Sequence, residues 1–201
     1  MAMGDEGALR PARGVENFAA LDLLVLTART ADGEALLREL QRTRARVRHL
    51  WPMPETIPAE VDVVFAELIP SLPQRLPWVP GQPKAALVVL LPNAPVDLPL
   101  LRNCAADAVL HRPFSAHAIP ACLLQAHARF TYERRLRTRI EKLDETLRDI
   151  RTIERAKTIL AQIRKISEDE AYHAIRRQAM DRRIAISAVA TAIVDSHDLL
   201  G

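Results

Sequence analysis

The chain has 201 residues, enough for one ordinary domain plus a smaller module or for one long mixed fold. Of these residues 49% are hydrophobic and 26% charged, a composition that excludes a wholly disordered protein. With no apolar stretch near the ~18 residues of a membrane-spanning helix and no signal-peptide-like start, we expect a cytoplasmic protein. The net charge is a mild +3. The two cysteines, Cys104 and Cys122, lack metal-ligand spacing and are expected to be buried thiols.

The first part of the chain alternates short apolar runs with helix-like segments. An amphipathic stretch covers 34–46, and the proline-rich segment from Pro70 to Pro83 has no helical period. Strands that alternate with helices form a parallel sheet with helices on both faces, so the pattern predicts an α/β fold. The strand candidates are 21–26, 61–66, 85–91 and 108–110.

The composition changes near residue 120. All 14 prolines lie at or before Pro120, and residues 82–200 contain no glycine. Because proline breaks helices and glycine loosens them, residues 121–200 are expected to be almost entirely helical. Residues 1–120 carry 12 basic and 13 acidic groups, whereas residues 129–183 carry 16 and 10. The chain therefore divides into a near-neutral mixed part and a basic helical part.

The segment from Asp107 to Ser115 resembles the last strand and the following loop of response-regulator receiver domains. In those domains a lysine normally precedes a proline and an aromatic residue. The resemblance implies a flavodoxin-like fold, a doubly wound parallel five-stranded sheet, over residues 16–122.

The phosphorylation chemistry of such a domain is absent. Receivers need an acidic pair after the first strand for magnesium, an aspartate after the third strand as phosphoacceptor, and a lysine in the last loop. Here Thr27 and Ala28 replace the pair, Glu67 the aspartate and Arg112 the lysine. We therefore expect a degenerate receiver that is not phosphorylated. Glu67 has two interpretations, a surface carboxylate or a fixed mimic of the phosphorylated state that pairs with Arg112.

A regular apolar stripe follows on the helical part, with spacings of four, three, four and three residues. This spacing predicts a coiled-coil helix over 123–152 that forms a homodimer; a helix packed on its own domain is the alternative. The spacing changes beyond Ile150, so the coil is expected to end there while the helix continues. The stripe consists of Leu136, Ile140, Leu143, Leu147 and Ile150.

The C-terminal part predicts a small three-helix bundle. Ser167 and Glu170 have the spacing of a capping box, which begins a helix over 168–181. A third helix is expected to begin near Ser187 and to bury Val189 and Val194.

Four segments of this part resemble the ANTAR domain of transcription antiterminators, to which we assign residues 145–201. They are Arg155–Leu160, Glu170–Arg176, Ala179–Met180 and Val189–Ala190. Two front segments, Leu50–Glu55 and Val61–Phe65, resemble the amidase-operon regulators of that family. The resemblance implies a dimer that binds stem-loops in nascent leader RNA and prevents the terminator from forming. It also implies a negative regulator, a ligand-sensing protein of periplasmic-binding-protein type.

The basic residues of the bundle are suited to RNA, because they can bind phosphates and arginine also stacks on unpaired bases. Tyr172 is either a core residue or a stacking platform. The candidate RNA-binding residues are Arg155, Lys157, Arg164, Lys165, Tyr172, Arg176, Arg177, Arg182 and Arg183.

Two other functions are weighed against this one. A DNA-binding response regulator needs polar side chains on its recognition helix, whereas 188–194 is almost entirely apolar. A protein-interaction module without nucleic-acid binding is the second alternative. No catalytic, metal or cofactor motif is found, so we expect a protein that is not an enzyme.

Overall fold

The computed structural model describes residues 18–79 and 82–200, so residues 16 and 17 of the predicted receiver lie outside the described range. After a short 3-10 turn, Phe18–Ala20, five parallel strands form one sheet in the order β2-β1-β3-β4-β5. This is the doubly wound order that the sequence analysis predicted. The strands are β1 Asp22–Leu26, β2 Arg46–His49, β3 Val63–Glu67, β4 Ala86–Leu91 and β5 Ala108–His111.

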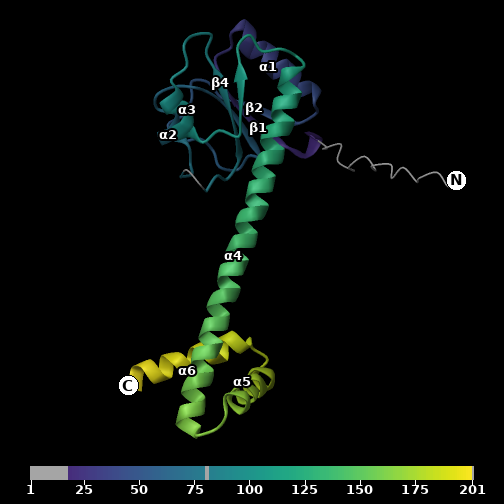
Figure 1. The fold of residues 1–201 in the computed structure, drawn as a ribbon. Helices are drawn as coiled ribbons and strands as arrows, with labels where there is room; N and C mark the ends of the chain where they lie inside the picture. The colour runs from purple at the N-terminus through teal and green to yellow at the C-terminus, as the bar shows by residue number, and fades with distance from the viewer. Residues whose placement is uncertain (1–17, 80–81, 201) are drawn as a thin grey trace, which may run out of the picture. The chain divides into compact units, whose positions relative to one another are not determined.

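Helices cover both faces of the sheet (Figure 1). Helix α1, Ala31–Arg42, and the beginning of α4, Ala118–Arg164, pack on one face. The short helices α2, Leu72–Arg75, and α3, Leu98–Cys104, belong to the other face.

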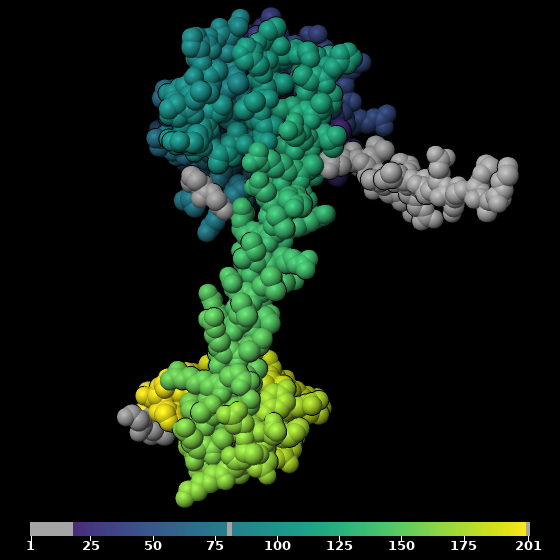
Figure 2. Space-filling model, viewed as in Figure 1, coloured from purple at the N-terminus to yellow at the C-terminus, as the bar shows by residue number. Residues whose placement is uncertain are grey.

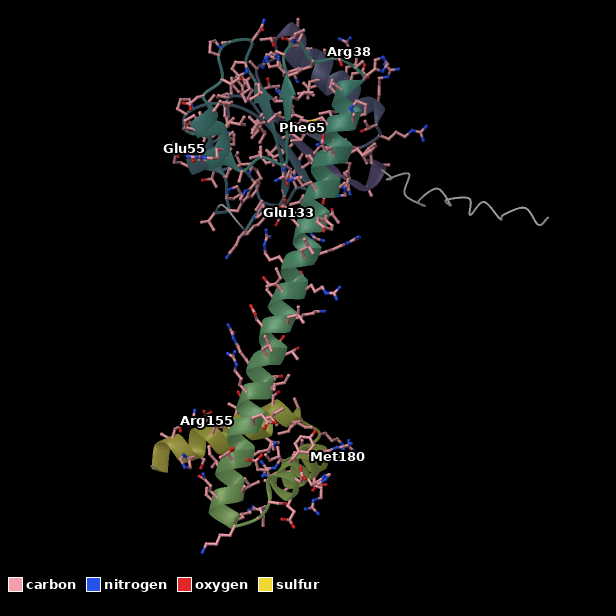
Figure 3. The ribbon with its side chains drawn as sticks, viewed as in Figure 1. Arg38, Glu55, Phe65, Glu133, Arg155 and Met180 are labelled. Atoms are coloured by element: carbon pink, nitrogen blue, oxygen red, sulfur yellow. The ribbon has the colours of Figure 1, made fainter. Side chains whose placement is uncertain are left out.

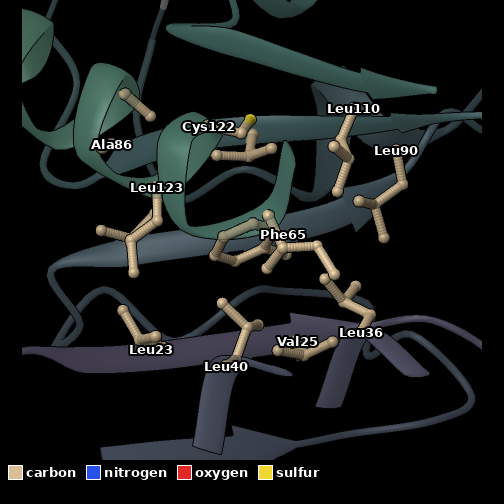
Figure 4. Close-up of a cluster of buried hydrophobic side chains, with 14 of the residues drawn as sticks. Leu23, Val25, Leu36, Leu40, Phe65, Ala86, Leu90, Leu110, Cys122 and Leu123 are labelled. Atoms are coloured by element: carbon tan, nitrogen blue, oxygen red, sulfur yellow. The ribbon is translucent and has the colours of Figure 1, made fainter. Parts of the chain in front are cut away.

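Alternate side chains of each strand supply the two cores. Leu23 and Val25 point into the core beneath α1 and α4, whereas Leu24 and Leu26 point into the other. Phe65 lies in the centre of the first core and is fully buried (Figure 4). Cys122 is buried there and Cys104 in the second core, as predicted, and burial raises the pKa of the Cys122 thiol to about 11.

Two elements differ from the sequence-based expectation. The amphipathic helix ends at Arg42, and residues 46–49 form strand β2, which no apolar run revealed. β2 is an edge strand whose residues alternate between exposed and partly buried. The segment from Pro70 to Pro83 also contains α2, and Pro73 lies in the first turn of that helix. Backbone amides in the first turn have no carbonyl partner within the helix, so a proline, which lacks the amide hydrogen, is tolerated there.

The chain divides into two compact units between Glu133 and Arg134. Leu123, Ala126 and Phe130, which the sequence analysis placed in the coiled-coil helix over 123–152, are instead buried in the core of the first unit. The exposed stripe starts only after Phe130. Among the described residues no helix is long and apolar enough to cross a membrane.

The second unit is a bundle of the last turns of α4 with α5, Glu168–Arg182, and α6, Ile186–Leu200. The capping box is present: Ser167 Oγ accepts from the amide of Glu170, whose carboxylate accepts from the amide of Ser167. The buried residues of this core are Ala156, Ile159, Ile175, Ala179, Val189, Ala190 and Val194.

The turns of this unit form without glycine. Lys165 after α4 and Arg183 after α5 have φ of 51° and 54°, in the left-handed region that usually favours glycine. The next amides then reach back to end each helix, from Ile166 to the carbonyl of Ala161 and from Ile184 to that of Ala179. The glycine-free segment after residue 120 is therefore nearly all helical, as expected, and turns at Lys165 and Arg183 divide it into separate helices.

Candidate functional sites

The first candidate site lies at the carboxyl edge of the sheet, where ligands bind in open α/β folds. Thr27 follows β1, Glu67 ends β3 and Arg112 follows β5, so the parallel order brings all three together. Glu67 Oε1 accepts from Thr27 Oγ1 at 2.5 Å, from the Ala28 amide at 3.2 Å and from Arg112 Nη2 at 2.8 Å. A single carboxylate oxygen thus holds three donors.

Arg112 is the centre of this site. Its side chain is only 16% exposed, lies within 3.5 Å of Asp32 Oδ2, and stacks 4.9 Å from the centre of the Phe114 ring. It donates to Thr27 Oγ1 as well as to Glu67. Of the two interpretations of Glu67, the contacts fit the pair with Arg112 better than a free surface carboxylate, because the Glu67 side chain is only 22% exposed.

The second candidate site is the apolar stripe of α4. In the single chain its five side chains are between 43% and 58% exposed, and Tyr132, four residues before Leu136, is 62% exposed. Figure 2 shows this stretch of α4 with its side chains uncovered on the face in view. Such a row of exposed leucines and isoleucines is unusual for a monomer.

The third candidate site is the set of basic residues in the bundle, and the structure divides it into two groups. Arg155, labelled on α4 in Figure 3, pairs with Asp198 at 2.7 Å. Lys157 is only 15% exposed and contacts Glu154 at 2.8 Å and Glu168 at 3.6 Å. The hydrogen bond that Lys157 donates to the Glu154 carboxylate raises the pKa of Lys157. These two cations are already paired within the protein.

Four other arginines gather around two adjoining hollows at the end of α4 and along α5, here called the basic hollows. One, of about 660 Å³, is lined by Arg164, Arg176 and Arg177 together with Ile166, Glu170, His173, Ala174 and Met180. The other, of about 420 Å³, shares Arg164 and Arg177 and adds Gln178, Asp181 and Arg182. Met180 is 67% exposed (Figure 3).

The remaining predicted residues are dispersed. Lys165 and Arg183 are exposed in the two turns, and their backbones end α4 and α5. Tyr172 is partly buried, with its ring 6.1 Å from that of His173, and it does not belong to the buried core.

A further hollow was not foreseen from the sequence. It measures about 440 Å³ and is here called the apolar hollow; it shares Gln178 and Arg182 with the smaller of the two basic hollows. Its walls come from three helices and a turn, so no local pattern marks it. Its other lining residues are Ile163, Ile184, Ala188, Val189, Ala192, Ile193, Ser196 and His197.

Comparisons with known proteins agree with this division of the chain. Residues 21–127 match the family model described as AmiR, N-terminal, which covers more than half of the chain, and residues 141–194 match the ANTAR domain. The aliphatic amidase regulator of Pseudomonas aeruginosa is 29% identical over 181 residues, which are 88% of this chain and 92% of that protein.

Two further likenesses are weaker. The transcriptional regulatory protein PdtaR of Mycobacterium tuberculosis is 32% identical over 113 residues, 56% of this chain and 55% of that protein. The solved structure of the response regulator StyR has a TM-score of 0.51 at 13% identity and covers 87% of this chain and 98% of that one, a likeness of fold alone. With a receiver-like unit of the AmiR type followed by an ANTAR domain, the chain belongs to the family of AmiR-like ANTAR transcription regulators.

Proposed function

We propose that this protein is a dimeric, RNA-binding antitermination regulator. In this role it binds stem-loops of a nascent leader RNA, keeps the terminator hairpin from forming and lets transcription continue. The observation that carries the proposal is the coincidence of the ANTAR match, residues 141–194, with the gathered arginines of the basic hollows.

The chemistry of the basic hollows suits a folded RNA. Arg164, Arg176, Arg177 and Arg182 present guanidinium groups that bind phosphate in a bidentate manner and stack on unpaired bases. Arg155 and Lys157, paired with Asp198, Glu154 and Glu168, would have to break those contacts to bind phosphate. The RNA-binding surface is therefore narrower than the full set of basic residues in the sequence.

Dimerisation supports the same role. The exposed stripe from Leu136 to Ile150 fits a parallel two-stranded coil, in which a second copy covers each apolar side chain. A dimer carries two bundles, so it binds two neighbouring stem-loops with an affinity that one bundle alone does not reach.

The input signal is not phosphorylation in this account. The carboxyl edge of the sheet has Glu67 in place of an acceptor aspartate, and the Arg112 guanidinium already donates to its Oε1. Control passes to a partner, a ligand-sensing protein of periplasmic-binding-protein type that holds the regulator inactive. Incubation with acetyl phosphate and magnesium, followed by mass spectrometry of the intact chain, should find no added phosphoryl group; a stable adduct would refute this part of the proposal.

The function itself is tested by selection of RNA. The full chain is incubated with hairpins of fixed stem and randomised loop, and the enriched hairpins are titrated by gel shift, with duplex DNA of the same sequence as control. Enriched loops with tighter binding to RNA than to DNA are expected. Equal affinity for the DNA would favour a DNA-binding response regulator, and no binding to either would favour a protein-interaction module.

A further inference from the structure

The apolar hollow lies beside the basic hollows in the bundle, and its lining is mixed in an informative way. Ile163, Ile184 and Ile193 give it apolar walls, whereas Gln178, Ser196 and His197 add an amide, a hydroxyl and an imidazole. Pockets that bind small flat ligands combine apolar walls with a few polar groups that fix orientation. A groove for a partner's helix would need only the apolar walls.

The position of the hollow points to its occupant. Gln178 and Arg182 line both the apolar hollow and the smaller basic hollow, whose other arginines are Arg164 and Arg177. An RNA strand whose phosphates lie on those arginines passes the mouth of the apolar hollow. A base on that strand needs only to leave the loop stack to enter it, a step that costs little in a single-stranded loop.

We propose that the apolar hollow is a base-recognition pocket, which takes one unstacked nucleobase of the RNA loop while Arg182 holds the adjoining phosphate. The proposal rests on the proposed RNA-binding function and adds to it the site of loop discrimination. Its volume of about 440 Å³ leaves room for a purine as well as a pyrimidine. The amide of Gln178 and the groups of Ser196 and His197 are the available hydrogen-bonding partners for the base edge.

The test fills the pocket without altering charge. Ala192→Phe and Ala188→Phe each place a ring in the apolar hollow from an exposed position on α6. Thr191→Phe, on the same helix but outside the hollow, is the matched control. The probe is a hairpin enriched from the randomised-loop selection, made in versions that lack one loop base at a time. Affinities are measured by gel shift with the full chain.

The wild-type chain should bind one of the abasic hairpins about tenfold more weakly than the intact hairpin. Ala192→Phe should bind the intact hairpin about tenfold more weakly and should no longer distinguish it from that abasic version, since both changes remove one interaction. Thr191→Phe should behave as the wild type. Gln178→Ala, which leaves the walls in place, should lower the preference among base types at that loop position; if Ala192→Phe does not fold, this variant carries the test.

Several results would overturn the pocket. The pocket is refuted, and the proposed function stands, if Ala192→Phe and Ala188→Phe bind RNA with normal affinity and Gln178→Ala keeps the same preference among base types. The pocket is also refuted if the phenylalanine variants change their oligomeric mass in light scattering while RNA affinity stays intact. That result would mean that the hollow is a contact with a second copy of the chain. Absence of RNA binding by the wild type would end both proposals together.

Discussion

Arg112 Nη2 donates to Glu67 Oε1 over 2.8 Å and joins the ends of β5 and β3, 45 residues apart. The guanidinium also contacts Thr27, Asp32 and the Phe114 ring. All of these contacts are made by the chain's own side chains. Arg112 thus ties the end of β5 to the ends of β1 and β3 at the carboxyl edge of the sheet.

The first prediction concerns that pair. Arg112→Ala should lower the free energy of unfolding of the first unit by about 1–3 kcal/mol, because it leaves a partly buried carboxylate without its charged partner. Arg129→Ala, which breaks an exposed pair with Glu133, should change it by under about 0.5 kcal/mol. Both tryptophans, Trp51 and Trp78, lie in the first unit, so urea unfolding followed by tryptophan fluorescence reports on it selectively. Equal effects of the two substitutions would mean that the pair is only a surface contact.

The second prediction concerns the stripe of α4. Leu143→Glu with Leu147→Glu should convert a dimer into a monomer in light scattering, because four like charges would meet in the seam. Thr138→Glu with Thr146→Glu adds the same charges at exposed positions outside the stripe, where each hydroxyl bonds only to a carbonyl of its own helix. The control should remain dimeric. A dimer that survives the Leu143 and Leu147 substitutions would place the interface elsewhere.

The third prediction concerns pH and the start of α5. Hydrogen bonds from the amide and hydroxyl of Ser167 lower the pKa of Glu170. The ionised carboxylate therefore stabilises the folded bundle fully above the ordinary pKa of 4.5, and this stabilisation is lost as the pH falls through the lower folded-state pKa.

After correction for the intrinsic exchange rate, the protection factors of the α5 amides should accordingly fall from pH 6 to pH 3 in the wild type and should fall less in Glu170→Gln; the two pH values bracket roughly the titration range of a carboxyl group. At neutral pH, Ser167→Ala should destabilise the bundle by about 1 kcal/mol through loss of the cap. An identical pH response in wild type and Glu170→Gln would contradict the assignment.

The fourth prediction separates the basic hollows from general positive charge. Replacement of Arg164, Arg176 and Arg177 by alanine should weaken binding to a selected hairpin and reduce the slope of log affinity against log salt by about two units. Replacement of Arg135, Lys142 and Arg148, three exposed cations of α4, removes the same charge and should leave the slope nearly unchanged. Equal losses in the two variants would show that binding follows net charge and not this surface.

The sequence predicted the elements whose signal is local. Apolar runs gave β1, β3, β4 and β5, and the Ser167–Glu170 spacing gave the start of α5. Strand β2 was not predicted, because an edge strand needs no continuous apolar run. Residues 123–130 were assigned to the coiled coil because a helix packed on its own domain has the same apolar periodicity as a coiled coil. Only tertiary packing distinguishes the two.

The sequence indicated which kinds of residue form the candidate sites, but not which of those residues lie together in the fold. Sequence reveals that Arg155 is basic, but not that Asp198, 43 residues away, neutralises it. It likewise provides no signal for the apolar hollow, since Ile163, Gln178 and Ala192 meet only when three helices pack. Charge composition alone therefore does not separate the paired cations from the arginines that gather around the basic hollows, and it gives no sign of the apolar hollow.

Antitermination is tested most directly by single-round transcription in vitro. The template carries a selected hairpin that shares its 3′ arm with an intrinsic terminator, so that the two structures exclude each other. The account predicts that the full chain raises the fraction of read-through transcripts in proportion to hairpin occupancy, and that the variant without Arg164, Arg176 and Arg177 does not. Unchanged termination at protein concentrations that saturate the hairpin would contradict it.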